Sequence, residues 1–177
     1  DKAVGKNTNQ KVKIIIKNLK KNKVDLHFVS DPENVAWLLN IRGKDSPYSP
    51  IPNCRLLLGV NGKKTFFCNK NKIDKFFVKK FKDMTFVDES LIEVFFNKLK
   101  GKKIMIDKSK LSIFFKDLLK KNNSIIEQID PINFLKSIKN KTEIKNSEKS
   151  HLLDGVALTK FIFWLEKNYR KKRITEI

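Results

Sequence analysis

The first residues of the chain carry a helical and then a strand-like pattern of hydrophobic positions. An amphipathic helix is predicted between Asn9 and Lys23, with Thr8 or Asn9 as its N-cap. The apolar residues of this segment are spaced i, i+3, i+4 and i+7: Val12, Ile15, Ile16 and Leu19. The short run from Asp25 to Val29 follows, and it predicts a buried strand.

A second helix is predicted to begin at Ser30-Asp31-Pro32, because proline is tolerated in the first turn of a helix. It is expected to run through Trp37 to about Asn40, with Gly43 as its C-terminal stop. Residues 44–53 contain three of the five prolines of the chain. We therefore expect an ordered loop without regular structure there.

The clearest local pattern is a pair of β-rich runs on either side of Asn61-Gly62. The runs are Cys54–Val60 and Lys63–Asn69. Because Asn-Gly is the preferred dipeptide of tight hairpins, this pattern predicts a β-hairpin with a type I′ turn.

Helical and strand patterns alternate from the hairpin to about residue 128. Helices are expected over Lys72–Phe81, Asp88–Leu99 and residues 111–119, and strands over Met84–Val87, Lys103–Asp107 and Ser124–Gln128. Alternating helices and strands with one hairpin predict an α/β fold, in which helices flank a mixed sheet.

The pattern changes at Asp130-Pro131. A short helix over Ile132–Ile138 is expected, followed by a long helix from Thr142 to about Asn168. The centre of the long helix, Val156–Leu165, is apolar on most sides. Such a helix is built to be buried on more than one side. We expect its covering layer to lie outside these 177 residues, and the missing initiator Met agrees with a chain that is part of a longer protein.

The composition is strongly basic, with a formal net charge of +20 from 39 Lys and Arg against 19 Asp and Glu. Only four of the basic residues are Arg, which is the side chain suited to bidentate recognition of phosphate and guanine. Lys is spread along the whole chain, beside many residues with A/T-rich codons. The charge therefore predicts no specific nucleic-acid site. No apolar stretch is long enough to span a membrane, and the N-terminus does not resemble a signal peptide.

Groups for catalysis are scarce. His27 lies in a predicted strand and is expected in the core. Ser150, His151 and Asp154 do not form a triad, because adjacent residues of a helix point in different directions. Cys54 and Cys68 lack metal-site spacing and are expected to be small buried residues, which fits a reducing cytoplasm. The acidic residues are scattered singly, so no dinuclear metal site is predicted.

The segment after the second predicted helix is the best candidate for a binding function. It presents Arg42, Asp45 and Tyr48 on a loop that prolines hold in shape, and such loops often carry function. The alternative is purely structural. In that case Trp37 and Leu38 lie in the core and Arg42 pairs with Asp45.

Two groups of residues, about a hundred positions apart, resemble a known family. The first is Ala36-Trp-Leu-Leu-Asn-Ile-Arg-Gly43 with Ser46-Pro-Tyr-Ser-Pro50. The second is Ile138-Lys-Asn-Lys-Thr-Glu-Ile144, leading to Asp154-Gly-Val-Ala-Leu158 and Trp164-Leu-Glu166. In this order they resemble the three-domain Xaa-Pro aminopeptidases (aminopeptidase P), which are creatinase/prolidase "pita-bread" metallopeptidases. The resemblance runs from about Gln10 to Ile177.

The resemblance implies a division into two parts. Residues 1–130 would form a creatinase/prolidase N-terminal-type domain, the second domain of a three-domain parent, with a mixed, ribonuclease-H-like sheet flanked by helices. Residues 131–177 would be the interdomain passage and the first helix of an incomplete, truncated pita-bread catalytic domain. Lys44 and Ser46 fill variable places of the family's R-G-x-D-x-P-x-x-P pattern, and the basic content exceeds family norms.

The resemblance also implies a function. The family removes the N-terminal residue from peptides with proline in second position, using two divalent metals, commonly manganese. Its metal ligands lie further along the catalytic domain, so no catalytic residue, metal ligand or cofactor is expected on this chain, and the chain alone should be inactive. The complete protein would be a cytoplasmic homodimer, with Arg42, Asp45 and Tyr48 lining the substrate entrance or a subunit interface. Two alternatives stay open: a stand-alone, non-enzymatic binding module of the same fold, and a basic nucleic-acid-binding domain.

Overall fold

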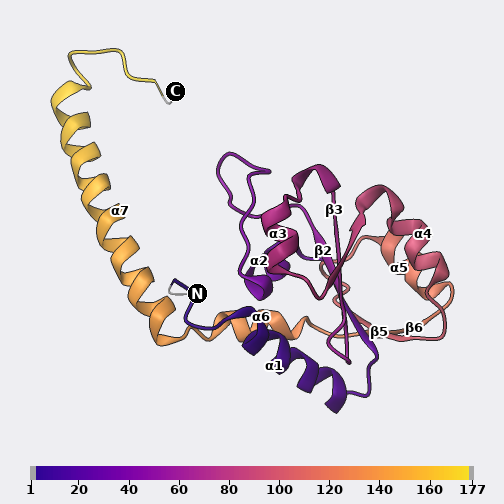
Figure 1. The fold of residues 1–177 in the computed structure, drawn as a ribbon. Helices are drawn as coiled ribbons and strands as arrows, with labels where there is room; N and C mark the ends of the chain where they lie inside the picture. The colour runs from indigo at the N-terminus through magenta and orange to yellow at the C-terminus, as the bar shows by residue number, and fades with distance from the viewer. Residues whose placement is uncertain (1–2, 176–177) are drawn as a thin grey trace. The chain divides into compact units, whose positions relative to one another are not determined.

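The structure is a computed structural model that describes residues 3–175, which fall into two compact units. The larger unit is Lys6–Ile138, and the smaller unit joins the residues up to Gly5 with those from Lys139 onward. Figure 1 shows the larger unit as a sheet with helices packed on it, and the smaller unit as one long helix with short extensions.

The order of elements in the larger unit follows the predicted alternation. Its elements are α1 (Thr8–Lys21), β1 (Leu26–Val29), α2 (Pro32–Leu39), β2 (Arg55–Gly59), β3 (Lys64–Cys68), the 3-10 turn η1 (Lys70–Lys72), α3 (Lys75–Lys80), β4 (Met84–Asp88), the 3-10 turn η2 (Glu89–Leu91), α4 (Ile92–Lys98), β5 (Lys103–Ile106), α5 (Ile113–Lys120), β6 (Ser124–Glu127) and α6 (Pro131–Ser137). The smaller unit contains α7 (Lys141–Asn168).

The six strands form one mixed sheet in the order β4-β3-β2-β1-β5-β6. The pairs β1–β2 and β2–β3 are antiparallel, whereas β3–β4, β1–β5 and β5–β6 are parallel. The predicted fold class, an α/β domain with helices on a mixed sheet, is therefore confirmed.

Each face of the sheet carries its own hydrophobic core, because successive side chains of a strand point to opposite faces. Leu56 and Leu58 of β2 belong to the core under α1, α2 and α6. Leu57, between them, belongs to the other core, beneath α4 and α5. The loop after α2 and the segment after β3 lie at the edge of the first core.

Several predicted ends of elements are wrong by a few residues. The N-cap of α1 is Asn7, which forms a capping box with Gln10, so the cap lies just before the expected Thr8 or Asn9. The C-cap of α2 is Asn40, in the left-handed conformation with φ 53°. Asn tolerates that conformation, and the helix therefore ends three residues before Gly43. The predicted helix over Lys72–Phe81 begins only after Asp74, whose carboxylate caps it.

The hairpin is confirmed, but its predicted turn type is wrong. Gly59 N donates to Lys63 O at 2.8 Å, so three residues separate the paired positions. Gly62 has φ 88°, whereas Asn61 has no positive φ, and a type I′ turn would need both. The side chain of Asn61 instead accepts a hydrogen bond from Lys63 N at 3.0 Å, which stabilises the longer loop.

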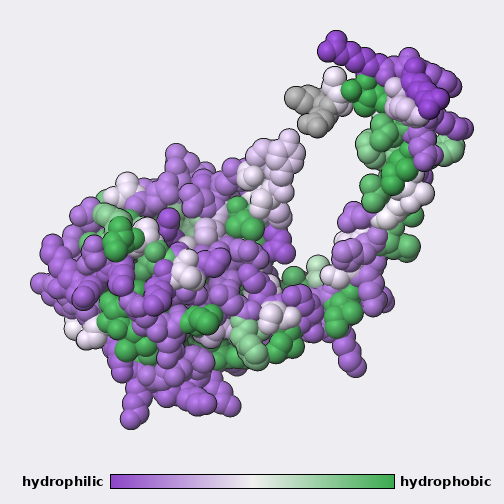
Figure 2. Space-filling model, turned by 180° about the vertical axis from the view of Figure 1, so that it is seen from behind, coloured by the Kyte–Doolittle hydropathy of each residue, from purple (hydrophilic) through white to green (hydrophobic). Residues whose placement is uncertain are grey.

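The predicted long helix is present as α7, capped by Asn140 and Glu143 in a capping box. None of its described side chains is buried, and hydrophobic side chains run along its surface (Figure 2). None of the helices that residues 3–175 form is long and apolar enough to cross a membrane.

The short helix α6 packs on α1 and α2, so the larger compact unit extends to Ile138. The division of the parent protein after residue 130 stays a prediction.

Candidate functional site

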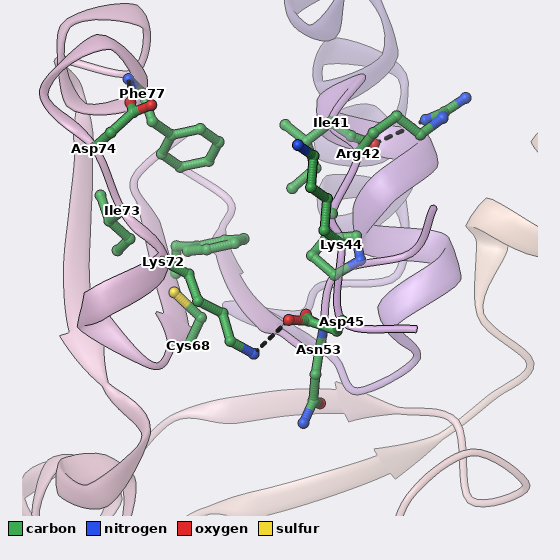
Figure 3. A pocket seen from close by; sticks show the side chains of 13 residues that line it. Ile41, Arg42, Lys44, Asp45, Asn53, Cys68, Lys72, Ile73, Asp74 and Phe77 are labelled. Carbon is green, nitrogen blue, oxygen red and sulfur yellow. Dashed lines mark hydrogen bonds and ion pairs between the residues drawn. The ribbon is translucent and has the colours of Figure 1, made fainter. Parts of the chain in front are cut away.

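A pocket of about 440 Å³ lies between the loop that follows α2 and the segment that follows β3 (Figure 3). Both sides of the pocket belong to the larger unit. Its lining residues are Ile41–Asp45, Pro52, Asn53, Phe66, Cys68, Lys72–Asp74 and Phe77.

The first wall of the pocket starts where α2 ends. Because Asn40 is left-handed, the chain turns back and Ile41 N donates to Ala36 O at 3.1 Å. The ammonium of Lys11 on α1 donates to Trp37 O at 2.8 Å and to Asn40 Oδ1 at 2.7 Å. It also lies 3.8 Å from the centre of the Trp37 ring. A buried cation thus fixes the helix end, where carbonyls carry partial negative charge.

The loop then crosses close to itself at Gly43. Its N–H donates to Pro50 O at 2.8 Å, and a Cβ at this position would lie 2.6 Å from Cα of Pro52. No real side chain fits at that separation. Gly43 is therefore required for the crossing of the loop rather than for ending the helix.

Asp45 holds the two walls of the pocket together. Its carboxylate accepts the backbone N–H of Asn53 at 2.5 Å and pairs with Lys72 Nζ at 2.8 Å. The hydrogen bond from Lys72 and that from Asn53 lower the pKa of Asp45. The same contact with Asp45 raises the pKa of Lys72. The carboxylate and the ammonium are therefore both charged at neutral pH.

Arg42 does not pair with Asp45, so the structural alternative considered from the sequence is wrong on this point. Its Nη1 donates to Ile41 O at 2.8 Å. Figure 3 shows the guanidinium directed away from the carboxylate. The guanidinium group of Arg42 is exposed to solvent, and its remaining N–H groups can donate hydrogen bonds to a ligand.

Tyr48 lies outside this pocket. Its side chain is 98% exposed, on a shallow hollow formed by the loop itself. Of the three predicted site residues, the structure brings Arg42 and Asp45 to one pocket and leaves Tyr48 on the outer side of the loop. A role of these residues in an entrance or an interface stays a prediction.

The second wall of the pocket contains residues that the sequence did not point to. Lys72 lies in η1, and Phe66 and Phe77 provide an aromatic floor, with ring centres 5.7 Å apart. Cys68 lines the same wall. Burial raises the pKa of Cys68 to about 11 and that of its neighbour Cys54 to about 12. The thiols are therefore protonated at neutral pH, and the pocket offers an ion pair and an apolar floor for recognition rather than a ready nucleophile.

The histidines take the places expected from the sequence. His27 is fully buried in β1, with Nε2 3.5 Å from Asp130 Oδ1. Within the described residues neither ring nitrogen has a hydrogen-bond partner. Burial lowers the pKa of His27, although Asp130 and Asp107 act in the opposite direction. His151 is exposed on α7.

Across residues 3–175, no group of three or more His, Cys, Asp or Glu side chains could hold a metal ion. A dinuclear hydrolase site needs several such ligands converging on the two ions. The described residues therefore do not fit a metal pair, and no chemical step through a metal is assigned to them.

The chain belongs to the Creatinase/Prolidase N-terminal domain family, which it matches over residues 1–143. Xaa-Pro aminopeptidase 1 of Dictyostelium discoideum is 34% identical over 173 residues, which are 97% of this chain and 27% of that protein. The crystal structure of X-prolyl aminopeptidase from Caenorhabditis elegans, a cytosolic enzyme with a di-nuclear active site, superposes with a TM-score of 0.81 at 25% identity. That superposition covers 99% of this chain and 30% of the nematode enzyme.

More distant structures share the fold alone. The prolidase from Pyrococcus horikoshii superposes with a TM-score of 0.59 at 22% identity, over 84% of this chain and 41% of that protein. The chain spans 27% and 30% of the length of the first two curated relatives that it matches. The family resemblance and the fold expected from the sequence are thus confirmed.

Proposed function

We propose that this chain is a non-catalytic fragment of a Xaa-Pro aminopeptidase, formed by the second domain of a three-domain parent and the first helix of its catalytic domain. In this proposal the complete enzyme removes the N-terminal residue from peptides with proline in second position. The reaction takes place at a pair of divalent metal ions, manganese by expectation, held by residues outside this chain. The domain itself shapes access to that site and contributes to contacts between the subunits of a cytoplasmic homodimer.

The extent of the match is the observation that carries the proposal. Nearly the whole chain aligns with less than a third of the Dictyostelium and nematode enzymes. Those proteins are named for Xaa-Pro aminopeptidase activity, and the nematode enzyme has a di-nuclear site. The described residues contain no cluster of metal-ligating side chains, so the proposal assigns the metals to another part of the protein.

The pocket beside Arg42 and Asp45 supports a role in recognition. Asp45 is tied to both walls, and this holds the loop at a fixed distance from η1. The guanidinium of Arg42 is exposed next to this fixed loop. A positioned cation of this kind suits the C-terminal carboxylate of a peptide or an acidic group on a second subunit.

The exposed apolar side chains of α7 support the other half of the proposal. Phe161, Phe163 and Trp164 are each between 44% and 57% exposed, although a helix with this composition is expected to be buried. In the proposal α7 is the first helix of the catalytic domain, and the rest of that domain covers these side chains.

The reading frame downstream of Ile177 gives a first test. We expect it to encode the two Asp, two Glu and one His that the family resemblance implies as metal ligands of the catalytic domain. A frame that ends without them would contradict the proposal and favour the stand-alone binding module. In a complete enzyme, Arg42→Ala should raise KM for Xaa-Pro peptides more than it lowers kcat. Lys17→Ala, which removes an exposed cation of α1 away from the pocket, is the matched control.

Nucleic-acid binding is the competing function, based on the net charge of +20. Contacts made only with phosphates weaken steeply with salt. Binding to duplex DNA is therefore expected to disappear at moderate ionic strength. Binding that persists at several hundred millimolar salt would favour this alternative over the peptidase proposal.

A further inference from the structure

The two cysteines of the chain face each other across the hairpin. The antiparallel register of β2 and β3 pairs Arg55 with Phe67, and Leu56 with Phe66. One step further from the turn, the same register places Cys54 opposite Cys68. The pair thus lies at the open end of the hairpin, where the chain enters β2 and leaves β3.

The hydrogen-bond pattern of the hairpin defines the kind of pair that the cysteines form. Hydrogen-bonded and non-hydrogen-bonded pairs alternate along an antiparallel ladder. The bond from Gly59 N to Lys63 O marks a hydrogen-bonded pair next to the turn. Counting outward, Arg55 and Phe67 form another such pair, and Cys54 and Cys68 form a non-hydrogen-bonded pair.

Non-hydrogen-bonded pairs bring side chains closest together, with Cα atoms about 4.5 Å apart. Disulfides usually join residues whose Cα atoms are about 4.4–6.8 Å apart. Both thiols also point to the same face of the sheet, because Cys54 and Cys68 belong to the core that contains Leu56 and Phe66. The register of the hairpin therefore suits a disulfide between these two residues.

We propose that Cys54 and Cys68 form a redox-active cross-strand dithiol that closes to a disulfide under a peroxide oxidant. The Cys68 thiolate attacks one peroxide oxygen, the O–O bond breaks, and a sulfenic acid forms with release of hydroxide, which takes up the proton that the thiol had lost and becomes water. The sulfur of Cys54 then attacks the sulfenic sulfur, the S–O bond breaks, and a second water leaves. In total the two thiols lose two hydrogen atoms and the peroxide is reduced to two water molecules.

Cys68 is the sulfur that reacts first, because it lines the pocket while Cys54 does not. Lys72 of the pocket wall favours its thiolate form, against the larger effect of burial. The reaction is therefore slow at neutral pH and faster under alkaline conditions, since the thiolate is the reactive species.

The disulfide would connect the two segments that hold Asp45. Asn53, which donates its N–H to the carboxylate, directly precedes Cys54. Lys72, which forms the ion pair, follows Cys68 by one short turn. Closing the bond joins these two anchors covalently and so fixes the mouth of the pocket. This inference does not depend on the proposed peptidase function.

The test measures the disulfide at equilibrium, so that slow kinetics do not decide the result. The full chain is incubated in a glutathione redox buffer at alkaline pH, with and without denaturant. Free thiols are then alkylated with N-ethylmaleimide, and the products are counted by mass spectrometry. The disulfide closes a 15-residue loop, and entropy alone predicts an equilibrium constant in the native chain about a hundredfold larger than in the unfolded chain.

Peroxide treatment of the native chain provides the second measurement. We expect a monomer that has lost two hydrogen atoms, takes up no maleimide and recovers both thiols with a reductant. Cys54→Ser and Cys68→Ser, the matched controls, should give no such product. A native equilibrium constant no larger than the unfolded one would overturn the proposal, as would two free thiols in peroxide-treated chain under conditions that oxidise a dithiol peptide.

Discussion

Lys11 offers the sharpest test of how the larger unit is held together. Its side chain is 1% exposed, and its ammonium links α1 to the end of α2 through Trp37 O and Asn40 Oδ1. Lys11→Met keeps the length and most of the apolar contact of the side chain. The substitution removes the charge and both of these donated hydrogen bonds.

The expected cost follows from the acceptors that lose their donor. A buried acceptor without a partner costs about 1–3 kcal/mol. Both acceptors are partly buried, and Trp37 O keeps a hydrogen bond from Asn40 N at 3.4 Å. Part of the cost is also offset because the ammonium no longer has to be kept out of water. We therefore expect Lys11→Met to lower the free energy of unfolding by about 1–3 kcal/mol. With a urea m-value of about 2 kcal/mol/M for a unit of this size, the midpoint should fall by about 0.5–1.5 M.

Tryptophan fluorescence during urea unfolding provides the assay. In a Trp164→Phe background, Trp37 is the remaining tryptophan, and it lies directly beneath the Lys11 ammonium. Lys17→Met on the exposed side of the same helix is the matched control. If Lys11→Met shifts the midpoint no more than Lys17→Met, the inferred role of a buried cation at the end of α2 is wrong.

Three further predictions concern other parts of the chain. Burial lowers the pKa of His27 in the folded state, so the stability contributed by the neutral ring is fully present above the unfolded pKa of about 6.5. Below that pH the free energy of unfolding should fall by at most about 1.4 kcal/mol per pH unit. His27→Leu should remove this pH dependence in urea titrations and His151→Gln should retain it; an unchanged slope in His27→Leu would contradict the assignment. Gly43→Ala should lower the free energy of unfolding by about 1–3 kcal/mol through the clash with the loop. Gly155→Ala should not lower the free energy of unfolding, because a Cβ at Gly155 meets nothing within 4 Å. Equal urea midpoints for the two variants would refute the close crossing of the loop at Gly43. Phe161→Lys with Trp164→Lys should reduce binding of an apolar dye such as ANS while circular dichroism keeps the helix signal; unchanged dye emission would contradict the exposure of α7.

The hairpin shows what local patterns can predict. Asn61-Gly62 between two β-rich runs was sufficient to place β2 and β3. The register follows from the turn. The two-residue turn that the pattern predicts would pair Cys54 with Asn69, whereas the three-residue loop of the structure places Cys54 opposite Cys68.

The burial of Lys11 is indicated only in part by the sequence. Lys11 stands at i−4 to Ile15 and i−8 to Leu19, on the buried side of the helix. In a chain with 39 Lys and Arg residues, one more lysine looks like part of a solvated surface. Its burial depends on acceptors at the end of α2, some 26 residues away, and periodicity within one helix contains no information about them.

The pocket was predictable only in part. The prolines and Gly43 indicated an ordered loop carrying Arg42 and Asp45. The partner of Asp45 is Lys72, which lies beyond the hairpin in η1. Only the mixed sheet brings these segments together, so the sequence suggested the nearer Arg42 instead.

The proposal that this chain is a non-catalytic part of a Xaa-Pro aminopeptidase is tested most directly by an activity assay. The release of the N-terminal residue from an Xaa-Pro peptide is measured for the purified chain with added Mn²⁺, beside the Dictyostelium relative as a positive control. We predict no release above the buffer blank while the relative is active. Turnover that rises in proportion to the amount of pure chain would contradict the claim.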